Sequence, residues 1–209
     1  MFCKRSHINQ HERERDHSAM RNFYRIASGI DIRPIALALH KSSLWNQYTL
    51  RTATPGSPHR EVDDIWLRMN DLNKCRQAAI DPGIYVDHRE SINYPGMTEL
   101  PVKPVIMALM NQVSGDRLGR CLISRMKPGT RILPHKDIGD DLTIYYDNEL
   151  YYSRYHIVIQ GLPGSVFRSG DEEVNMQTGE IWWFRNDIEH EVMNYSADDR
   201  IHIVCDIHS

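Results

Sequence analysis

The chain has 209 residues, of which 41% are hydrophobic and 25% charged, and its formal net charge at pH 7 is −3. This composition is typical of a single globular domain with a sizeable core, and without a lysine- or arginine-rich tract it makes nucleic acid an unexpected partner. There is no apolar stretch of the signal-peptide type and no apolar run long enough to cross a membrane, so we expect a cytoplasmic protein.

The first half of the chain predicts a polar tail followed by a small helical region. Residues 1–21 are polar and of mixed charge, which indicates a flexible tail or a solvated helix more than a metal site, although histidines occur there. Scattered apolar residues in 22–50 indicate one or two helices packed beside the main core. The elements expected next are a loop at 52–59, a buried strand at 63–68, a turn-rich region at 81–96 and a helix at 103–113.

From residue 120 the pattern changes to short runs rich in β-branched and aromatic residues, separated by turn residues. Strands without intervening helices disfavour a doubly wound α/β sheet and predict a sandwich or jelly roll. Cys121 and Cys205 lie in two of these runs, and the four cysteines show no CxxC pair, so we expect buried free thiols in a reducing compartment. The predicted strands are 121–126, 154–160, 165–168, 173–176, 180–184, 190–195 and 200–207.

Two histidines and an aspartate in this region form a candidate metal site. His135 and Asp137 are two positions apart at the end of a strand, which places both on one side, and His190 lies far downstream. Two imidazoles and a carboxylate on one face of a metal leave the other face open, as in non-heme Fe(II) oxygenases. A His-x-Asp pair alone is more often a surface feature; a later histidine followed after ten positions by Arg200 makes the metal site the better interpretation.

Strand alternation groups further polar side chains. Arg154 and His156 share a face, and so do Arg200 and His202, because residues i and i+2 of a strand point the same way. Burying arginine and histidine inside an apolar barrel is costly unless they bind something charged. These faces therefore predict an interior site for a metal and a dicarboxylate ligand.

Six stretches, in order along the chain, resemble the aspartyl/asparaginyl β-hydroxylases. They are residues 124–135, 154–156, 179–184, 189–192, 199–200 and 204–207. The resemblance implies a double-stranded β-helix, a cupin-like jelly roll over 120–208, with flanking N-terminal helices, in an α+β chain that forms one oxygenase domain over 1–209. It also implies a dioxygenase that uses Fe(II), 2-oxoglutarate and O2 to hydroxylate an unactivated C–H bond of an amino acid, free or within a peptide or protein.

The resemblance assigns roles to single residues. His135 and His190 resemble the two iron-binding histidines, and Arg200 resembles the arginine that binds the distal carboxylate of 2-oxoglutarate. The residues that resemble others around that cosubstrate are Ser124, Arg154 and His156. The named hydroxylases have Gly at the position of Asp137, so Asp137 completes a facial triad as in most 2-oxoglutarate oxygenases, including proline hydroxylases that look related. An Asp/Asn or a Pro type of substrate therefore stays open.

Two other classes of protein remain alternatives: a cupin-like metal-binding module without turnover, and a zinc hydrolase that uses the same three residues. The first has no need of a buried cation such as Arg200, and the second lacks an HExxH-type motif. Residues 139–153, an insertion relative to the family with several tyrosines and carboxylates, are either a solvated hairpin or a lid over the substrate.

Overall fold

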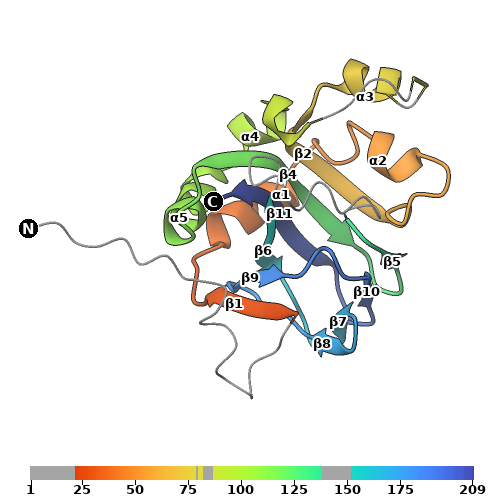
Figure 1. Cartoon of the computed structure of the whole chain (residues 1–209). Helices are drawn as coiled ribbons and strands as arrows, with labels where there is room; N and C mark the ends of the chain where they lie inside the picture. Colours follow the sequence, from red (N-terminus) through yellow and green to blue (C-terminus); the bar gives the residue numbers. More distant parts are fainter. Residues whose placement is uncertain (1–21, 79, 82–86, 138–151) are drawn as a thin grey trace, which may run out of the picture.

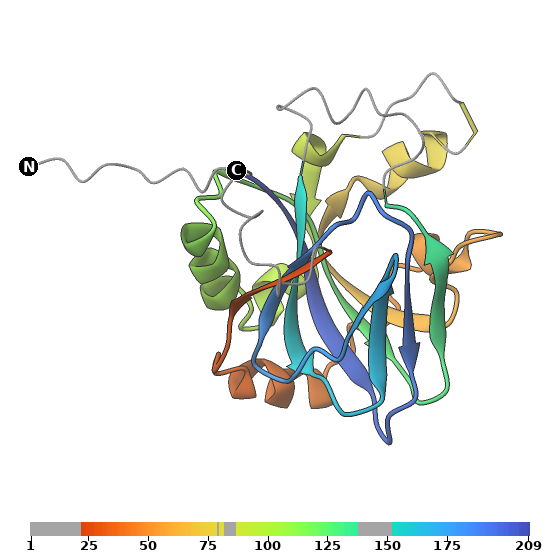
Figure 2. The same ribbon diagram turned by 60° about the horizontal axis from the view of Figure 1, so that its bottom comes forward.

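Eleven strands form two antiparallel sheets in the computed structural model, which describes residues 22–78, 80–81, 87–137 and 152–209 (Figures 1 and 2). The larger sheet has the order β1 (Phe23–Ala27), β9 (Ile181–Phe184), β6 (Ser153–Gln160), β11 (Arg200–His208), β4 (Arg117–Met126), β2 (Val62–Asn70) and β3 (Ser91–Asn93). The smaller sheet has the order β5 (Arg131–His135), β10 (His190–Asn194), β7 (Ser165–Ser169) and β8 (Glu172–Val174).

The chain from β4 to β11 winds between the two sheets. Strands β4, β6, β9 and β11 belong to the larger sheet, and the strands between them belong to the smaller one. This winding defines a double-stranded β-helix, so the predicted jelly roll is confirmed. Within the described residues, no helix is both long and apolar enough to span a membrane.

Helices cover the outer face of the larger sheet (Figures 1 and 2). Helices α1 (Arg33–His40) and α5 (Lys103–Gln112) each begin with a proline in the first turn, where a missing N–H costs nothing. Their buried residues, such as Ile35 and Leu39, are spaced along one face and pack on the sheet. The shorter elements are α2 (Leu50–Ala53), α3 (Leu72–Ala78), the 3₁₀ turn η2 (His88–Glu90) and α4 (Pro95–Glu99).

Strand alternation separates an apolar outer face of the larger sheet from an inner face that carries both polar and apolar side chains. Ile65, Ile123 and Ile203 are register partners on β2, β4 and β11, and all three lie in the core beneath the helices. Their neighbours along the strands therefore point inward, toward the smaller sheet. Cys121 and Cys205 lie on the outer face as buried free thiols, 3.1 Å apart between their Sγ atoms, as predicted.

Two predictions for the first half of the chain are incomplete. The region 22–50 contains a helix beside the core, α1, as predicted, but it also contains strand β1, Phe23–Ala27, which pairs with β9. Phe23 of this strand packs edge-on against Phe167, with 5.4 Å between the ring centroids. The pairing partner is remote in sequence, so a local pattern could not reveal it.

The second is the turn-rich region 81–96: its described residues, 81 and 87–96, contain the 3₁₀ turn η2 but also strand β3 and the start of α4. Gly96 lies in α4 and not in a turn. A Cβ at this position would lie 2.8 Å from both Cγ2 of Ile65 and the carbonyl oxygen of Trp66. Gly96 is small so that α4 can approach β2 closely.

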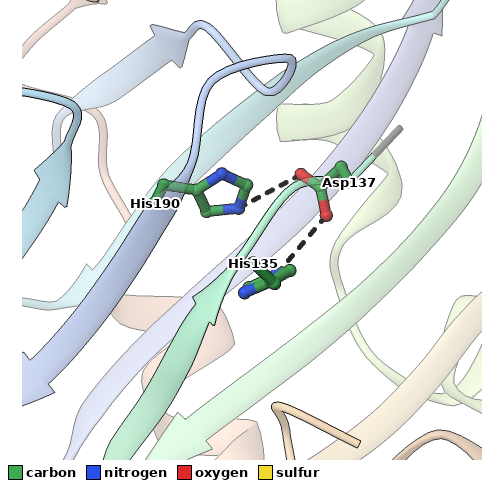
Figure 3. Close-up of side chains that lie close together, drawn as sticks. All are labelled: His135, Asp137 and His190. Atoms are coloured by element: carbon green, nitrogen blue, oxygen red, sulfur yellow. Dashed lines mark ion pairs between the residues drawn. The ribbon is translucent and has the colours of Figure 1, made fainter. Parts of the chain in front are cut away.

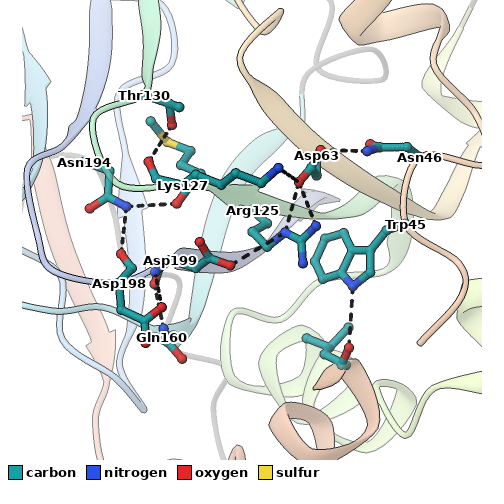
Figure 4. A network of polar contacts seen from close by, with 12 residues as sticks. Trp45, Asn46, Asp63, Arg125, Lys127, Thr130, Gln160, Asn194, Asp198 and Asp199 are labelled. Carbon is teal, nitrogen blue, oxygen red and sulfur yellow. Dashed lines mark hydrogen bonds and ion pairs between the residues drawn. The ribbon is translucent and has the colours of Figure 1, made fainter. Parts of the chain in front are cut away.

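A polar network fastens the segment before α2 to the larger sheet (Figure 4). Arg125 on β4 donates two hydrogen bonds to Asp63 on β2, and its guanidinium lies over the ring of Trp45 at 4.1 Å. Asn46, which has a positive φ that Asn tolerates well, donates to the same Asp63 carboxylate. The network thus positions the chain that leads into α2, next to the open end of the barrel.

Candidate active site

The structure brings together the three residues predicted to bind a metal. His135 ends β5 and His190 begins β10, and the strand register places them opposite each other. Asp137 follows two residues after β5, with Oδ1 3.6 Å from Nε2 of His135 and Oδ2 3.4 Å from Nε2 of His190 (Figure 3). One ligand atom from each residue lies within 4.8 Å of the other two.

Backbone carbonyls orient both imidazoles. Nδ1 of His135 lies 2.8 Å from the carbonyl oxygen of Leu133, and Nδ1 of His190 lies 2.9 Å from that of Ile188. Because a carbonyl can only accept, each Nδ1 carries the proton, and in the neutral ring Nε2 presents a lone pair to Asp137. Burial, opposed by Asp137, lowers the pKa of His190 to about 4, so this ring is neutral at pH 7.

Asp137 completes a set of acceptors that a cation would suit. Its side chain is 8% exposed, and no described residue forms a hydrogen bond with Oδ2. Burial raises the pKa of this carboxyl, but the charge of Arg154 and contacts with the two histidines outweigh that and hold the pKa well below its usual range. Two imidazole lone pairs and a carboxylate converge here, and this donor set fits a divalent transition metal.

Arg200 lies in the same cavity without a carboxylate partner among the described residues. It is 2% exposed; Nη2 lies 3.1 Å from Nδ1 of His202, and Nη1 lies 3.8 Å from Sδ of Met126. Burial lowers the pKa of Arg200 to about 9, which still leaves the guanidinium charged at pH 7. Ser124 lines the cavity too, and its buried hydroxyl has no hydrogen-bond partner in the described part of the chain. A buried cation beside an unused hydroxyl is a site for an anion.

Comparison with known proteins agrees with this geometry. A model of the aspartyl/asparaginyl β-hydroxylase family matches residues 88–209, a span that includes the three clustered residues and Arg200. The chain belongs to this family. It is therefore a 2-oxoglutarate-dependent hydroxylase, and the predicted recognition and enzyme class are confirmed.

No curated protein matches the chain. Among solved structures, the hydroxylase is similar to a 2OG-Fe(II) oxygenase family oxidoreductase from Burkholderia pseudomallei, with 16% identity, a TM-score of 0.46, and coverage of 70% of this chain and 67% of that one. It is also similar to a predicted oxalate decarboxylase from Thermotoga maritima, with 16% identity, a TM-score of 0.34, and coverage of 49% and 73%. A cupin domain from Bordetella pertussis is 13% identical, with a TM-score of 0.33 and coverage of 45% and 85%.

A further histidine, His202, lies between His156 and Arg200, two residues that the sequence predicts to lie around the cosubstrate. Nδ1 of His202 lies 3.2 Å from Nδ1 of His156 and 3.1 Å from Arg200. Because arginine only donates, Nδ1 of His202 accepts, and His156 donates its Nδ1 proton to the same atom. Burial, reinforced by Arg200, lowers the pKa of both histidines well below the usual range. Alternation put His202 on the inner face, but only the contacts reveal that it orients both neighbours.

Arg154 lies beside the metal-site residues and away from Arg200. It pairs with Asp137 through Nη1, and it donates to Asp206 from Nε at 2.7 Å and from Nη2 at 3.0 Å. Asp206 and Arg154 are direct register partners on β11 and β6, so the fork of the guanidinium is held in place. A contact of Arg154 with the cosubstrate stays a prediction, and Asp206 is a site residue that sequence reasoning missed.

Two residues of the predicted loop 52–59 and its flank also reach the site. His59 packs edge-on against His135, with 4.7 Å between ring centroids, and Arg51 lines the same cavity. Burial, followed by the charge of Arg51, lowers the pKa of His59 to about 2. No motif marked either residue.

The predicted lid at 139–153 falls, apart from its last two residues, outside the part of the chain that the structure describes, and it stays a prediction.

Proposed function

We propose that this hydroxylase holds Fe(II) with His135, Asp137 and His190 and binds the distal carboxylate of 2-oxoglutarate with Arg200. The observation that carries the proposal is a buried guanidinium that pairs with no carboxylate of the described residues and lies in the same cavity as three convergent metal-type ligands. Two imidazoles and one carboxylate are the ligand set of non-heme Fe(II) oxygenases. When bound, Fe(II) and 2-oxoglutarate supply the O2 activation that hydroxylation of a C–H bond requires.

The residues of the protein bind, orient and exclude water. Arg200 offers the planar fork that suits a carboxylate, and the hydroxyl of Ser124 is a second donor for it. His202 fixes the guanidinium by accepting one of its N–H groups. Phe167 and Phe184 line the inner wall and keep water from the cavity.

Arg154 and Asp206 give the metal site a charge-balanced support. Arg154 neutralises part of the negative charge of Asp137, and Asp206 neutralises the remainder of the charge on Arg154. The alternating charges of Asp206, Arg154 and Asp137 hold the Asp137 carboxylate beside the two histidines, in position to bind the metal with them. His156 lines the cavity, and burial lowers its pKa and keeps it neutral. Because its proton is on Nδ1, its Nε2 carries a lone pair.

The substrate that we propose is an amino acid, free or within a peptide, of the Asp/Asn or Pro type. The name of the family supports the first, and Asp137, which those hydroxylases lack, keeps the second open. In the test, the protein is reconstituted with Fe(II) and 2-oxoglutarate in the absence of O2 and mixed with each member of a panel of amino acids and peptides. O2 is then admitted, and the products are measured by mass spectrometry. The expected result is a product heavier by one oxygen, with stoichiometric succinate; a protein that binds neither metal nor 2-oxoglutarate would refute the proposal.

A further inference from the structure

A second cavity, of about 380 Å³, adjoins the metal-site cavity on the inner face of the larger sheet. We call it the outer cavity; Leu50 and Arg51 of α2 line it, and α2 itself is labelled in Figure 1. Arg51, His59, Asp137 and Arg154 line both cavities, so the two meet at the metal-site aspartate. Its volume falls within the range of about 300–1,000 Å³ that is usual for small-molecule sites.

One side of the outer cavity is apolar. Leu50, Met69, Leu122 and Val204 line it together with the ring of Trp66. Trp66 is 3% exposed and stacks on Tyr48, yet its buried indole N–H has no hydrogen-bond partner among the residues that the structure describes. Such a wall suits an apolar body that carries an acceptor, because a buried N–H donor left unpaired costs free energy.

The charged groups of the outer cavity favour an anion at its inner end. Its ionisable groups include three arginines and two aspartates, and Arg154 is already shared between both aspartates. Arg120 donates Nε to the side chain of Asn70. Arg51 donates Nη1 to Asp64 at 2.6 Å, and among the described residues this is its one ion pair. The guanidinium is thus held at one edge by a buried carboxylate, and Arg51 lines both cavities where they meet.

We propose that the outer cavity binds the primary substrate as a carboxylate-bearing molecule with an apolar body, whose carboxylate binds Arg51 and whose body covers Trp66 and Leu122. The proposal rests on the proposed function and names its substrate class. A carboxylate anchored at Arg51 lies at the junction, so the carbons next to it face the metal site. A free amino acid and the C-terminal residue of a peptide share this chemistry. An aspartate within a peptide does not, because it has no apolar body for the outer wall.

The test is calorimetric titration of the protein loaded with Fe(II) and 2-oxoglutarate under argon, so that no turnover occurs. The probes are L-leucine, L-proline, L-leucinamide, the peptide Gly-Gly-Leu, and a capped peptide with a central aspartate. At least one of the two free acids or Gly-Gly-Leu is expected to bind, and removal of the carboxylate in leucinamide is expected to weaken the binding of leucine about tenfold or more. Tighter binding of leucine than of Gly-Gly-Leu would indicate a free amino acid as the substrate, and the reverse would indicate the C-terminal residue of a peptide.

Arg51→Met should weaken the bound acid about tenfold or more while the affinity for 2-oxoglutarate is unchanged. Since this variant leaves Asp64 buried without its partner, Arg51→Met/Asp64→Asn is the version expected to fold as well as the wild type. Arg33→Met, at an exposed arginine paired with Asp31, is the matched control and should bind every probe normally.

The substrate-class proposal is overturned if no acid binds the wild type, if leucinamide binds as well as leucine, if the double variant keeps the wild-type affinity, or if only the aspartate peptide binds. The proposed function is tested separately by the 2-oxoglutarate titration of the same samples. Loss of 2-oxoglutarate binding in the wild type would refute the proposed function, whereas normal 2-oxoglutarate binding with failed acid binding refutes the substrate class alone.

Discussion

Replacing Arg200 by Met tests the proposed cosubstrate site. We expect the change to maintain or raise the stability of the protein without ligand and to weaken the binding of 2-oxoglutarate. Burial lowers the pKa of Arg200 from its usual value to about 9, which at about 1.36 kcal/mol per pKa unit is a cost on the order of a few kcal/mol for burying the charge. No carboxylate among the described residues is orphaned by the change. The variant without ligand is therefore expected to be at least as stable as the wild type.

Binding should respond in the other direction. Removing one partner of a desolvated, hydrogen-bonded charge pair costs roughly 2–5 kcal/mol, or about 30-fold to several thousandfold in Kd for 2-oxoglutarate. Calorimetry measures the Kd, and thermal unfolding with and without 2-oxoglutarate checks it independently, because a ligand that binds only the native state raises Tm. The wild type should show the rise in Tm and Arg200→Met should not.

Arg125→Met supplies the contrast, because Arg125 holds Asp63 and covers Trp45, away from the cavity. It should lower Tm and leave 2-oxoglutarate binding intact. If Arg200→Met instead unfolds at a clearly lower temperature and keeps its 2-oxoglutarate affinity, the guanidinium is a structural group and the reasoning fails.

Three further predictions address the metal site, the support of Arg200 and the fold. His190→Ala should abolish binding of one Fe(II) in an anaerobic titration; stoichiometric iron in that variant would remove His190 from the ligand set. His202→Leu should raise the Kd for 2-oxoglutarate about tenfold, whereas in His202→Asn the amide oxygen takes the place of Nδ1 and restores most of the affinity, so equal losses in both would exclude the acceptor role. Gly96→Ala should lower the free energy of unfolding by about 1–3 kcal/mol in urea, because the added Cβ overlaps Ile65 and the backbone of Trp66; an unchanged midpoint would show that α4 yields easily.

Much of the site was readable because its chemistry depends on short spacings. His135 and Asp137 are two residues apart, and Arg200 and His202 share a face, so the alternation of a strand alone predicts which side chains point together. The run of short strands after residue 120 likewise predicted a sandwich or jelly roll, and the resemblance to the hydroxylases narrowed this to the jelly roll. These features are local, and the sequence by itself determined them.

The tertiary structure decided which distant side chains meet. Strand β1, the pairing of Arg154 with Asp206, and the arrival of Arg51, His59 and Trp66 beside the metal-site residues all depend on contacts between segments far apart in the chain. Their local sequence carries no trace of those contacts, because apolar packing and strand register are satisfied jointly by both partners. The residue types of the metal site were therefore visible in the sequence, whereas the cavity beside them exists only in the folded chain.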